Sequence, residues 1–168
     1  MDQIRTPRLV LRSPAASDAG AIVKLAGDWG VARMTSRIPH PYTLADAEDF
    51  LGMSIGTYLA ECEGQVIGCI GAGLQEDGSF ELGYWIGRPF WKRGFATEGA
   101  RGLIEHVRSQ TPRARIAVGH MIDNPASRRV IEKLGFQATG ERTIWSVARG
   151  ENVRCLRYEL SSPDRLGL

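Results

Sequence analysis

The chain has 168 residues, of which 43% are hydrophobic and 24% charged, with a formal net charge of +2. This length suits one compact domain, so we expect a single domain over residues 1–168. The balanced charge argues against a nucleic-acid partner, and every apolar stretch falls short of the roughly 20 residues that a membrane span needs. The N-terminal residues lack a basic run followed by an apolar core, which favours a cytoplasmic protein.

Cysteine usage gives little sign of metal or disulfide chemistry. Cys62, Cys69 and Cys155 are odd in number, form no CxxC pair and have no nearby histidine at a metal-ligand spacing. We interpret them as buried thiols in strands, with a reactive thiol as the alternative. No metal site is expected.

Apolar periodicity predicts seven strands. The turn pairs Glu63-Gly64 and Asp77-Gly78 separate three consecutive strands, which favours an antiparallel meander. A whole helix joins the last of these three to the next strand, so those two are expected to be parallel neighbours. The predicted strands cover residues 9–12, 57–62, 66–73, 80–87, 115–122, 139–148 and 153–160.

Four stretches predict helices, at residues 18–26, 44–55, 95–107 and 125–134. Ser17 or Asp18 can cap the first helix, and Thr43 begins a capping-box pattern for the second. The apolar face of the second helix extends to Ile55. Residues 28–42 show no sustained period and indicate a loop or short turns.

The strand at residues 80–87 has two unlike faces. Phe80, Leu82, Tyr84 and Ile86 share one face, whereas Glu81, Gly83 and Trp85 share the other. A carboxylate beside a glycine and an indole costs stability when it is buried, so the second face suggests a pocket. Together the elements predict an α+β fold, a mixed and mostly antiparallel sheet of about seven strands with helices on both faces.

Residues 91–97 join the end of that strand to the start of a helix. Such a junction presents unpaired backbone N–H groups and the positive end of a helix dipole, which favours an anion. Gly94 and Ala96 are small enough for a diphosphate to approach the backbone, and Lys92 and Arg93 add positive charge. The alternative is an ordinary turn with solvated basic residues, since neither GxxxxGK[ST] nor GxGxxG is present.

Three blocks of sequence, in their joint spacing, resemble the GNAT superfamily of acyl-CoA-dependent N-acyltransferases, and within it the RimJ/RimL-type branch. The blocks are TPRLVLR at 6–12, ELGYWI at 81–86 with WKRGFATE at 91–98, and NPAS at 124–127 with KLGF at 133–136. The likeness implies a GNAT-like sheet that splays between its fourth and fifth strands. Trp91 and Lys92 depart from the general family pattern, although tryptophan is common there in this branch. The tyrosine that many relatives use as an acid is replaced by Ile131.

The resemblance implies an enzyme that moves an acetyl group from acetyl-CoA to a primary amine by direct attack, without a metal. The amine would belong to a protein N-terminus or to a small molecule. The implied cofactor site consists of Trp85, Ile86, Trp91, Lys92, Arg93, Gly94, Phe95, Ala96, Thr97, Asn124, Ser127 and Arg129. A catalytically silent acyl-CoA-binding regulatory module is the alternative. Homodimers occur in this branch, so a homodimer is one expected state.

Acetyl transfer needs a neutral amine, a stabilised oxyanion and help for the leaving thiolate. Glu81 is the first candidate for the base, directly or through a water, with a structural salt bridge as its alternative. Ser127 is the candidate to hydrogen-bond the leaving sulfur, with ordinary helix N-terminal bonding as its alternative. Asp123 and His120 are further base candidates. Backbone N–H groups of Trp85 and Ile86 are candidates to polarise the thioester carbonyl, and candidate acceptor-binding residues are Trp29, Arg33 and Tyr42.

Overall fold

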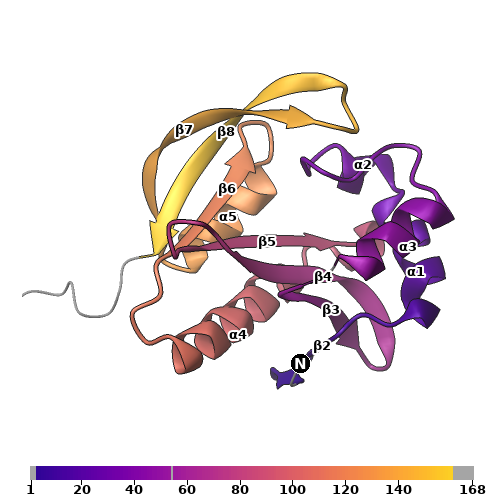
Figure 1. Ribbon diagram of the computed structural model, residues 1–168, viewed down its shortest axis with the longest axis horizontal. Helices are drawn as coiled ribbons and strands as arrows, with labels where there is room; N and C mark the ends of the chain where they lie inside the picture. The colour runs from indigo at the N-terminus through magenta and orange to yellow at the C-terminus, as the bar shows by residue number, and fades with distance from the viewer. Residues whose placement is uncertain (1–2, 54, 161–168) are drawn as a thin grey trace, which may run out of the picture.

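The computed structural model describes residues 3–53 and 55–160 as one eight-stranded sheet with helices on both faces (Figure 1). The strands are β1 (Ile4–Arg5), β2 (Val10–Arg12), β3 (Thr57–Cys62), β4 (Gln65–Leu74), β5 (Phe80–Ile86), β6 (Ile116–Met121), β7 (Gln137–Ser146) and β8 (Glu151–Leu160). The helices are α1 (Ala19–Ala26), α2 (Trp29–Ala32), α3 (Leu44–Gly52), α4 (Phe95–Gln110) and α5 (Pro125–Lys133), with the 3-10 turns η1 (Ala16–Asp18) and η2 (Arg88–Phe90).

The strand order is β1-β2-β3-β4-β5-β6-β8-β7, and its mixed, mostly antiparallel character confirms the predicted fold class. The meander β3-β4-β5 is antiparallel throughout, and its first turn has left-handed backbone at both Glu63 and Gly64. The parallel pairing of β5 with β6 is also confirmed. All seven predicted strands are present, and the two-residue β1 is an addition to them.

The sheet opens between β5 and β6. Their ladder runs only from the Phe80–Ile116 pair to the Leu82–Val118 pair, whereas β6 pairs with β8 along its whole length. Beyond Leu82 the two strands diverge, with β6 leading up toward the β7–β8 hairpin (Figure 1). This opening is the splay that the resemblance implies between the fourth and fifth predicted strands.

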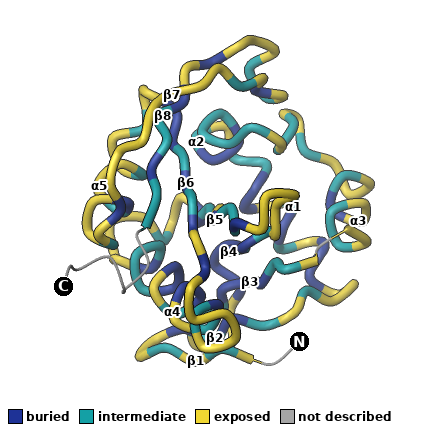
Figure 2. Tube along the Cα trace, turned by 60° about the vertical axis from the view of Figure 1, so that its left-hand side comes forward, coloured by how far each residue is buried: buried dark blue, intermediate teal, exposed yellow. Residues whose placement is uncertain are grey.

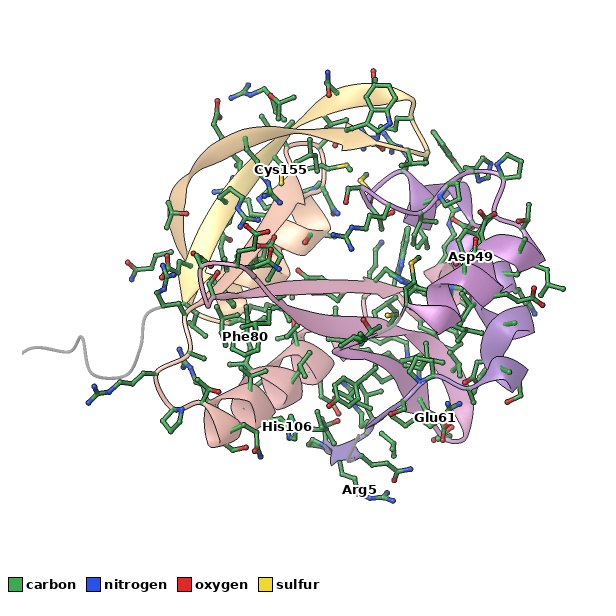
Figure 3. All side chains as sticks on the ribbon, in the orientation of Figure 1. Arg5, Asp49, Glu61, Phe80, His106 and Cys155 are labelled. Atoms are coloured by element: carbon green, nitrogen blue, oxygen red, sulfur yellow. The ribbon has the colours of Figure 1, made fainter. Side chains whose placement is uncertain are left out.

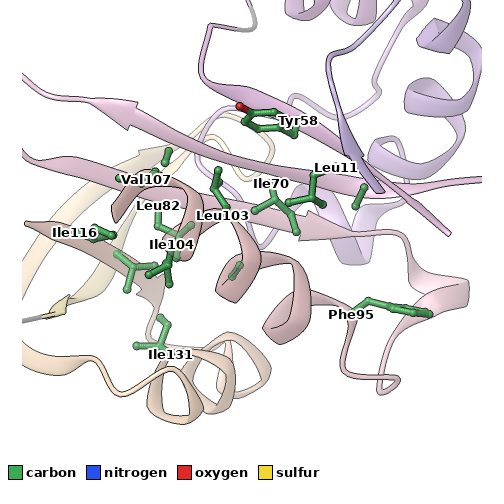
Figure 4. Packing of buried hydrophobic residues seen from close by; sticks show 14 of the residues in the cluster. Leu11, Tyr58, Ile70, Leu82, Phe95, Leu103, Ile104, Val107, Ile116 and Ile131 are labelled. Atoms are coloured by element: carbon green, nitrogen blue, oxygen red, sulfur yellow. The ribbon is translucent and has the colours of Figure 1, made fainter. Parts of the chain in front are cut away.

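Two hydrophobic clusters hold the helices on the sheet. The larger one joins α4 and α5 to one face, where Leu82, Ile116 and Ile131 are each at most 3% exposed (Figure 4). The smaller one packs α1 and α3 on the other face around Leu59 and Ile22. Burying side chains of this size contributes about 1.5–3 kcal/mol each, so both faces of the sheet are firmly covered.

Several local predictions need correction. The helix predicted at 44–55 ends at Gly52, and Ile55 lies in a turn with 89% of its surface exposed. Asp18 is the N-cap residue of α1 as predicted, but its side chain makes no capping hydrogen bond to the helix, because Arg12 and the Ala15 N–H hold its carboxylate. Residues 28–42 contain the four-residue helix α2, consistent with the short turns predicted there.

Burial varies strongly along the sheet (Figure 2). Strand β4 is buried over most of its length, whereas β7 at the edge of the sheet is exposed from Gln137 to Thr143. None of the helices in the described ranges is both long and apolar enough to span a bilayer.

Arg12 joins the start of the sheet to the turn before α1. Its guanidinium forms two 2.8 Å hydrogen bonds with the Asp18 carboxylate and one of 2.7 Å with Glu61 on β3. Asp18 also accepts the N–H of Ala15 at 2.8 Å and is only 7% exposed. The Arg12 hydrogen bonds hold the pKa of Asp18 below its usual value of 3.8, outweighing the effect of burial.

We expect Asp18→Asn to lower the free energy of unfolding by about 2 kcal/mol at neutral pH, because a buried charge-assisted pair is broken. A lowered folded-state pKa stabilises the protein above the unfolded value, and this contribution is lost as pH falls through the folded pKa. Urea unfolding of both proteins at a series of pH values measures the difference. It should shrink below pH 3.8; a difference independent of pH would contradict this account.

Candidate active site

The open edge of β5 carries specific backbone groups. The N–H of Phe80 donates to Arg115 next to β6, whereas the N–H of Gly87 donates to Ile67 of β4, each at 2.8 Å. Backbone direction alternates along a strand, so the N–H and C=O of Tyr84 and Ile86 point to the β6 side. These backbone groups of Tyr84 and Ile86 therefore face the opening between β5 and β6. Trp85 is instead paired with Cys69 of β4, so Ile86 rather than Trp85 offers an amide to the opening.

The segment after β5 turns sharply into α4. Lys92 has a φ of 61° and Gly94 a φ of 79°, both left-handed, and α4 begins at Phe95 with Gly94 as its N-cap. Alternating left- and right-handed residues direct successive N–H groups into one concavity, and the dipole of a long helix adds positive potential there. The side chains of Lys92 and Arg93 are exposed beside it. The segment therefore has the geometry of an anion seat.

The N-terminal block fixes this segment from below. The Glu98 carboxylate, in the first turn of α4, accepts hydrogen bonds of 2.7 Å from the Thr6 hydroxyl and from the backbone N–H and Nε of Arg8. Arg8 also donates to the carbonyl of Arg93 at 3.0 Å. Burial raises the pKa of Glu98, but these hydrogen bonds outweigh burial and hold the pKa below its usual value. Sequence reasoning grouped these blocks by resemblance but missed the contact between them.

Aromatic side chains complete the junction. The guanidinium carbons of Arg8 and Arg93 lie 4.5 and 4.9 Å from the centre of the buried Phe95 ring. The indole N–H of Trp91 donates to the carbonyl of Ile86 at 2.6 Å. A Cβ placed on Gly30 of α2 would lie 3.1 Å from the Trp91 ring. Trp91 therefore connects the open edge of β5 with the loop around α2.

Tyr84 crosses the splay to reach α5. Its hydroxyl lies 2.8 Å from Ser127 Oγ, and Ser127 N–H donates to the capping side chain of Asn124 at 3.1 Å. Burial raises the pKa of Tyr84 to about 12, although its bond with Ser127 acts in the opposite direction. Ile131, one turn further along α5, is fully buried. Strand alternation placed Tyr84 correctly on the core face, but its partner on a distant helix was not predicted.

Glu81 lies on the opposite face of β5 in an ion pair. Its two oxygens accept hydrogen bonds from the two terminal guanidinium nitrogens of Arg157 on β8, and the bond to Oε2 is 2.6 Å long. Arg142 on β7 approaches the same carboxylate at 3.5 Å. The salt bridge named above as the alternative to a base is thus present, and the sequence pattern did not identify either arginine.

A second network of charged residues lies at the turn of the β7–β8 hairpin. Asp123, just before α5, pairs with Arg149 at 2.9 Å and with Arg33 at 3.3 Å. Arg149 also donates to the carbonyl of Arg33 at 2.7 Å, and Val147 N–H donates to Ser36 at 3.0 Å. The hydrogen bond from Arg149, more than the opposing effect of burial, holds the pKa of Asp123 below its usual value. The hairpin, the loop after α2 and the start of α5 are therefore joined.

The predicted acceptor residues do not form one cluster. Trp29 is exposed on α2 with its ring 5.1 Å from that of His40, and Arg33 belongs to the Asp123 network. The Tyr42 hydroxyl donates to the Asp46 carbonyl at 3.3 Å, and burial raises the pKa of Tyr42 to about 12. Tyr42 therefore lies beside α3 and packs against the smaller hydrophobic cluster, which Trp85 of β5 also contacts.

The remaining titratable candidates have structural partners. His120 is 4% exposed, with Nδ1 2.8 Å from the carbonyl of Met121 and Nε2 3.2 Å from the Tyr158 hydroxyl. Cys69 and Cys155 are buried as predicted, whereas Cys62 is only partly buried. Cys155 belongs to β8 of the β7–β8 hairpin (Figure 3). Burial raises the pKa of Cys69 to about 12. Within residues 3–53 and 55–160, no group of His, Cys, Asp and Glu suits a metal ion.

Gly94 and Thr97 open onto a groove of about 870 Å³ between β1 and α4. Arg5, Arg101 and Lys133 line this groove, together with the acidic Glu98 and Glu105. Of the other basic residues on α5, Arg128 pairs with Glu132 at 2.8 Å and Arg129 is exposed. The groove thus adjoins the anion seat along α4, and Arg101 was not identified from the sequence.

Known proteins share this arrangement. Two relatives, both called uncharacterized N-acetyltransferases, match nearly the whole chain. YoaA of Bacillus subtilis (strain 168) is 30% identical over 95% of the chain and 97% of its own length. The p20 protein of Bacillus licheniformis is 27% identical over 99% of the chain and 100% of its own length. The solved structure of RimL, a ribosomal L7/L12 α-N-protein acetyltransferase in complex with coenzyme A, has a TM-score of 0.84 at 17% identity, covering 95% of this chain and 98% of that one.

The family assignment follows from sequence and fold together. Residues 8–137 match the acetyltransferase (GNAT) domain, a span that includes the β5–β6 splay and the turn into α4. The RimL similarity is one of fold, since the sequence identity is low. The chain belongs to the GNAT family of acetyl-CoA-dependent acetyltransferases.

Proposed function

We propose that the protein transfers the acetyl group of acetyl-CoA to a primary amine, that of a protein N-terminus or of a small molecule. The observation that carries this proposal is the continuity between the open edge of β5 and the anion seat at the start of α4. One offers hydrogen bonds to amides and the other to phosphates, and coenzyme A carries both groups.

The donor would lie along this continuous surface. Its diphosphate would accept hydrogen bonds from the N–H groups of residues 93–97, while the pantetheine amides pair with Ile86 as an added strand. Trp91 would border the pantetheine and Asn124 would contact it from α5. Lys133 and Arg101 in the adjoining groove are better placed than the ion-paired Arg128 to meet the 3′-phosphate. Arg129, exposed on α5, remains a second candidate for that phosphate.

The reaction itself needs few groups. The nitrogen of a neutral amine attacks the thioester carbonyl carbon, a C–N bond forms, and the C–S bond breaks with its electron pair on sulfur. The N–H of Tyr84, further from the diphosphate along the open edge than Ile86, is our proposed donor to the developing oxyanion. Glu81 is our proposed base, acting through a water, because Arg157 already occupies both carboxylate oxygens. Ser127 would hydrogen-bond the departing sulfur.

The acceptor would enter on the Glu81 face of β5. The loop around α2 and the β7–β8 hairpin, joined by Arg149, border this face. Trp29 and Arg33 remain our proposed acceptor contacts there, with Tyr42 supporting the loop from α3. The name of RimL refers to a protein N-terminal acceptor, which supports including peptides with free N-termini among the amines to be tested.

Incubation with acetyl-CoA and a panel of amines tests the proposal. We expect stoichiometric release of thiol and a mass increase of one acetyl group on at least one amine, either a peptide with a free N-terminus or a small amine. Calorimetry on the same protein measures acetyl-CoA binding. Binding without turnover across the panel would favour the silent regulatory module, and absence of binding by folded protein would contradict both functions.

Gly94→Asp should weaken acetyl-CoA binding at least about tenfold, because a carboxylate would stand against the diphosphate. Gly78→Asp is the matched control, since Gly78 has nearly the same φ, 78° against 79°, in a turn on the far side of β5. Calorimetry of both variants, with thermal unfolding to show that each is folded, measures the effect. Equal affinities in the two variants would place the diphosphate elsewhere.

Glu81→Gln should reduce kcat by about 100-fold or more, since general-base catalysis contributes at least that factor. The loss should be greatest below about pH 8, where an α-amine is mostly protonated. Arg157→Met, which breaks the same ion pair but keeps the carboxylate, should lose much less activity. Equal losses in the two variants at every pH would show that Glu81 serves only the salt bridge.

A further inference from the structure

Tyr84 and Ser127 face each other where the sheet opens. Tyr84 belongs to β5, two residues beyond the last pair of the β5–β6 ladder, and Ser127 lies in the first turn of α5. Their oxygens are 2.8 Å apart, and the Tyr84 hydroxyl also lies 3.4 Å from the Ser127 carbonyl. The two residues are 43 positions apart in the sequence, so the fold alone brings them together.

The direction of this hydrogen bond follows from the chemistry of the two hydroxyls. A phenol is the stronger donor and an aliphatic hydroxyl the stronger acceptor. Burial raises the pKa of Tyr84 to about 12, so the phenol keeps its proton across the range in which an amine can react. Of the two directions that the 2.8 Å contact allows, we therefore assign Tyr84 as the donor and Ser127 Oγ as the acceptor, since Oγ is nearer to the phenol than the Ser127 carbonyl at 3.4 Å. The hydrogen on Ser127 Oγ is then free to donate elsewhere.

We propose that Tyr84 is a positioning residue for the leaving group: by donating to Ser127 Oγ, it turns the Ser127 O–H toward the sulfur of coenzyme A. This inference rests on the proposed function and adds a residue to it. Asn124 holds the Ser127 backbone from the other side, through the 3.1 Å bond to its N–H. The serine is thereby fixed at both its backbone and its side chain.

The role assigned to Ser127 is hydrogen bonding, not proton transfer. When the C–S bond breaks, its electron pair stays on sulfur, and the thiolate accepts a hydrogen bond from Ser127 Oγ. The proton lost by the amine passes through the base to solvent, and the thiolate takes a proton from solvent after release. No proton leaves Tyr84, which agrees with the high pKa of a buried phenol.

The alternative is that Tyr84 only fastens α5 to the sheet. Packing already provides such an attachment, since Ile131 on α5 and Leu134 at its C-cap join the cluster that contains Leu82 and Ile116. Removing the Tyr84 hydroxyl while keeping its ring separates the two roles. A fastening role predicts lost stability, whereas a positioning role predicts a loss specific to the thiolate.

The experiment compares Tyr84→Phe, Ser127→Ala and the double variant with the natural protein. We expect each single variant to lose about tenfold in kcat with KM for acetyl-CoA within about twofold, and the double variant to lose no more than Ser127→Ala alone. Tyr58→Phe, which removes the hydroxyl of a buried tyrosine on β3, is the matched control. It should keep the natural kcat.

A binding measurement isolates the thiolate. Affinity for coenzyme A, compared with desulfo-coenzyme A, should rise as pH passes about 8.5, where a thiol ionises. In Tyr84→Phe this rise should largely disappear, while affinity for desulfo-coenzyme A stays unchanged. An unchanged rise, or additive losses of kcat in the double variant, would overturn the inference and leave the proposed function intact. If the natural protein neither binds acetyl-CoA nor acetylates an amine, the proposed function fails, and this inference fails with it.

Discussion

The unpaired half of β5 is the constraint on which the rest of the site depends. A strand in the middle of a sheet must satisfy its backbone N–H and C=O groups on both sides, and β6 does so only as far as Leu82. Beyond that point the remaining groups need another partner. Trp91 supplies one, through its bond to the Ile86 carbonyl. Beyond Val118, β6 keeps its pairing with β8 and leaves β5.

Charged clamps hold the two ends of this opening from outside. At the anion seat, Glu98 accepts hydrogen bonds from Thr6 and Arg8. At the other end, Arg149 donates hydrogen bonds to Asp123 and to the loop after α2. Each clamp joins segments that are distant in sequence and pairs an arginine with a carboxylate. In the Arg149–Asp123 pair two guanidinium nitrogens meet the two carboxylate oxygens, a bidentate geometry that fixes orientation as well as distance. The turns at both ends of the opening are therefore held by side-chain contacts although they lie in loops.

Sequence patterns predicted the parts of the structure that depend on local rules. The turn pairs Glu63-Gly64 and Asp77-Gly78 specified the meander, alternation assigned the faces of β5, and the Asn124-Pro125 start placed α5. Pairing between distant side chains was beyond such rules. Glu81 and Arg157 are 76 positions apart, and the position of Ser127 gave no sign of Tyr84. The end of α3 was missed because Ile55 continued an apolar pattern that no tertiary contact uses.

The bond between Thr6 and Glu98 spans 92 positions of the chain. Contacts of such long range form late in folding, because a large loop must close before they are made. The turn that leads into α4 therefore acquires its final shape only after the beginning and the middle of the chain have met. Nascent or N-terminally truncated chains lack this support. Tight binding of a nucleotide at this turn would therefore indicate that the whole sheet has formed.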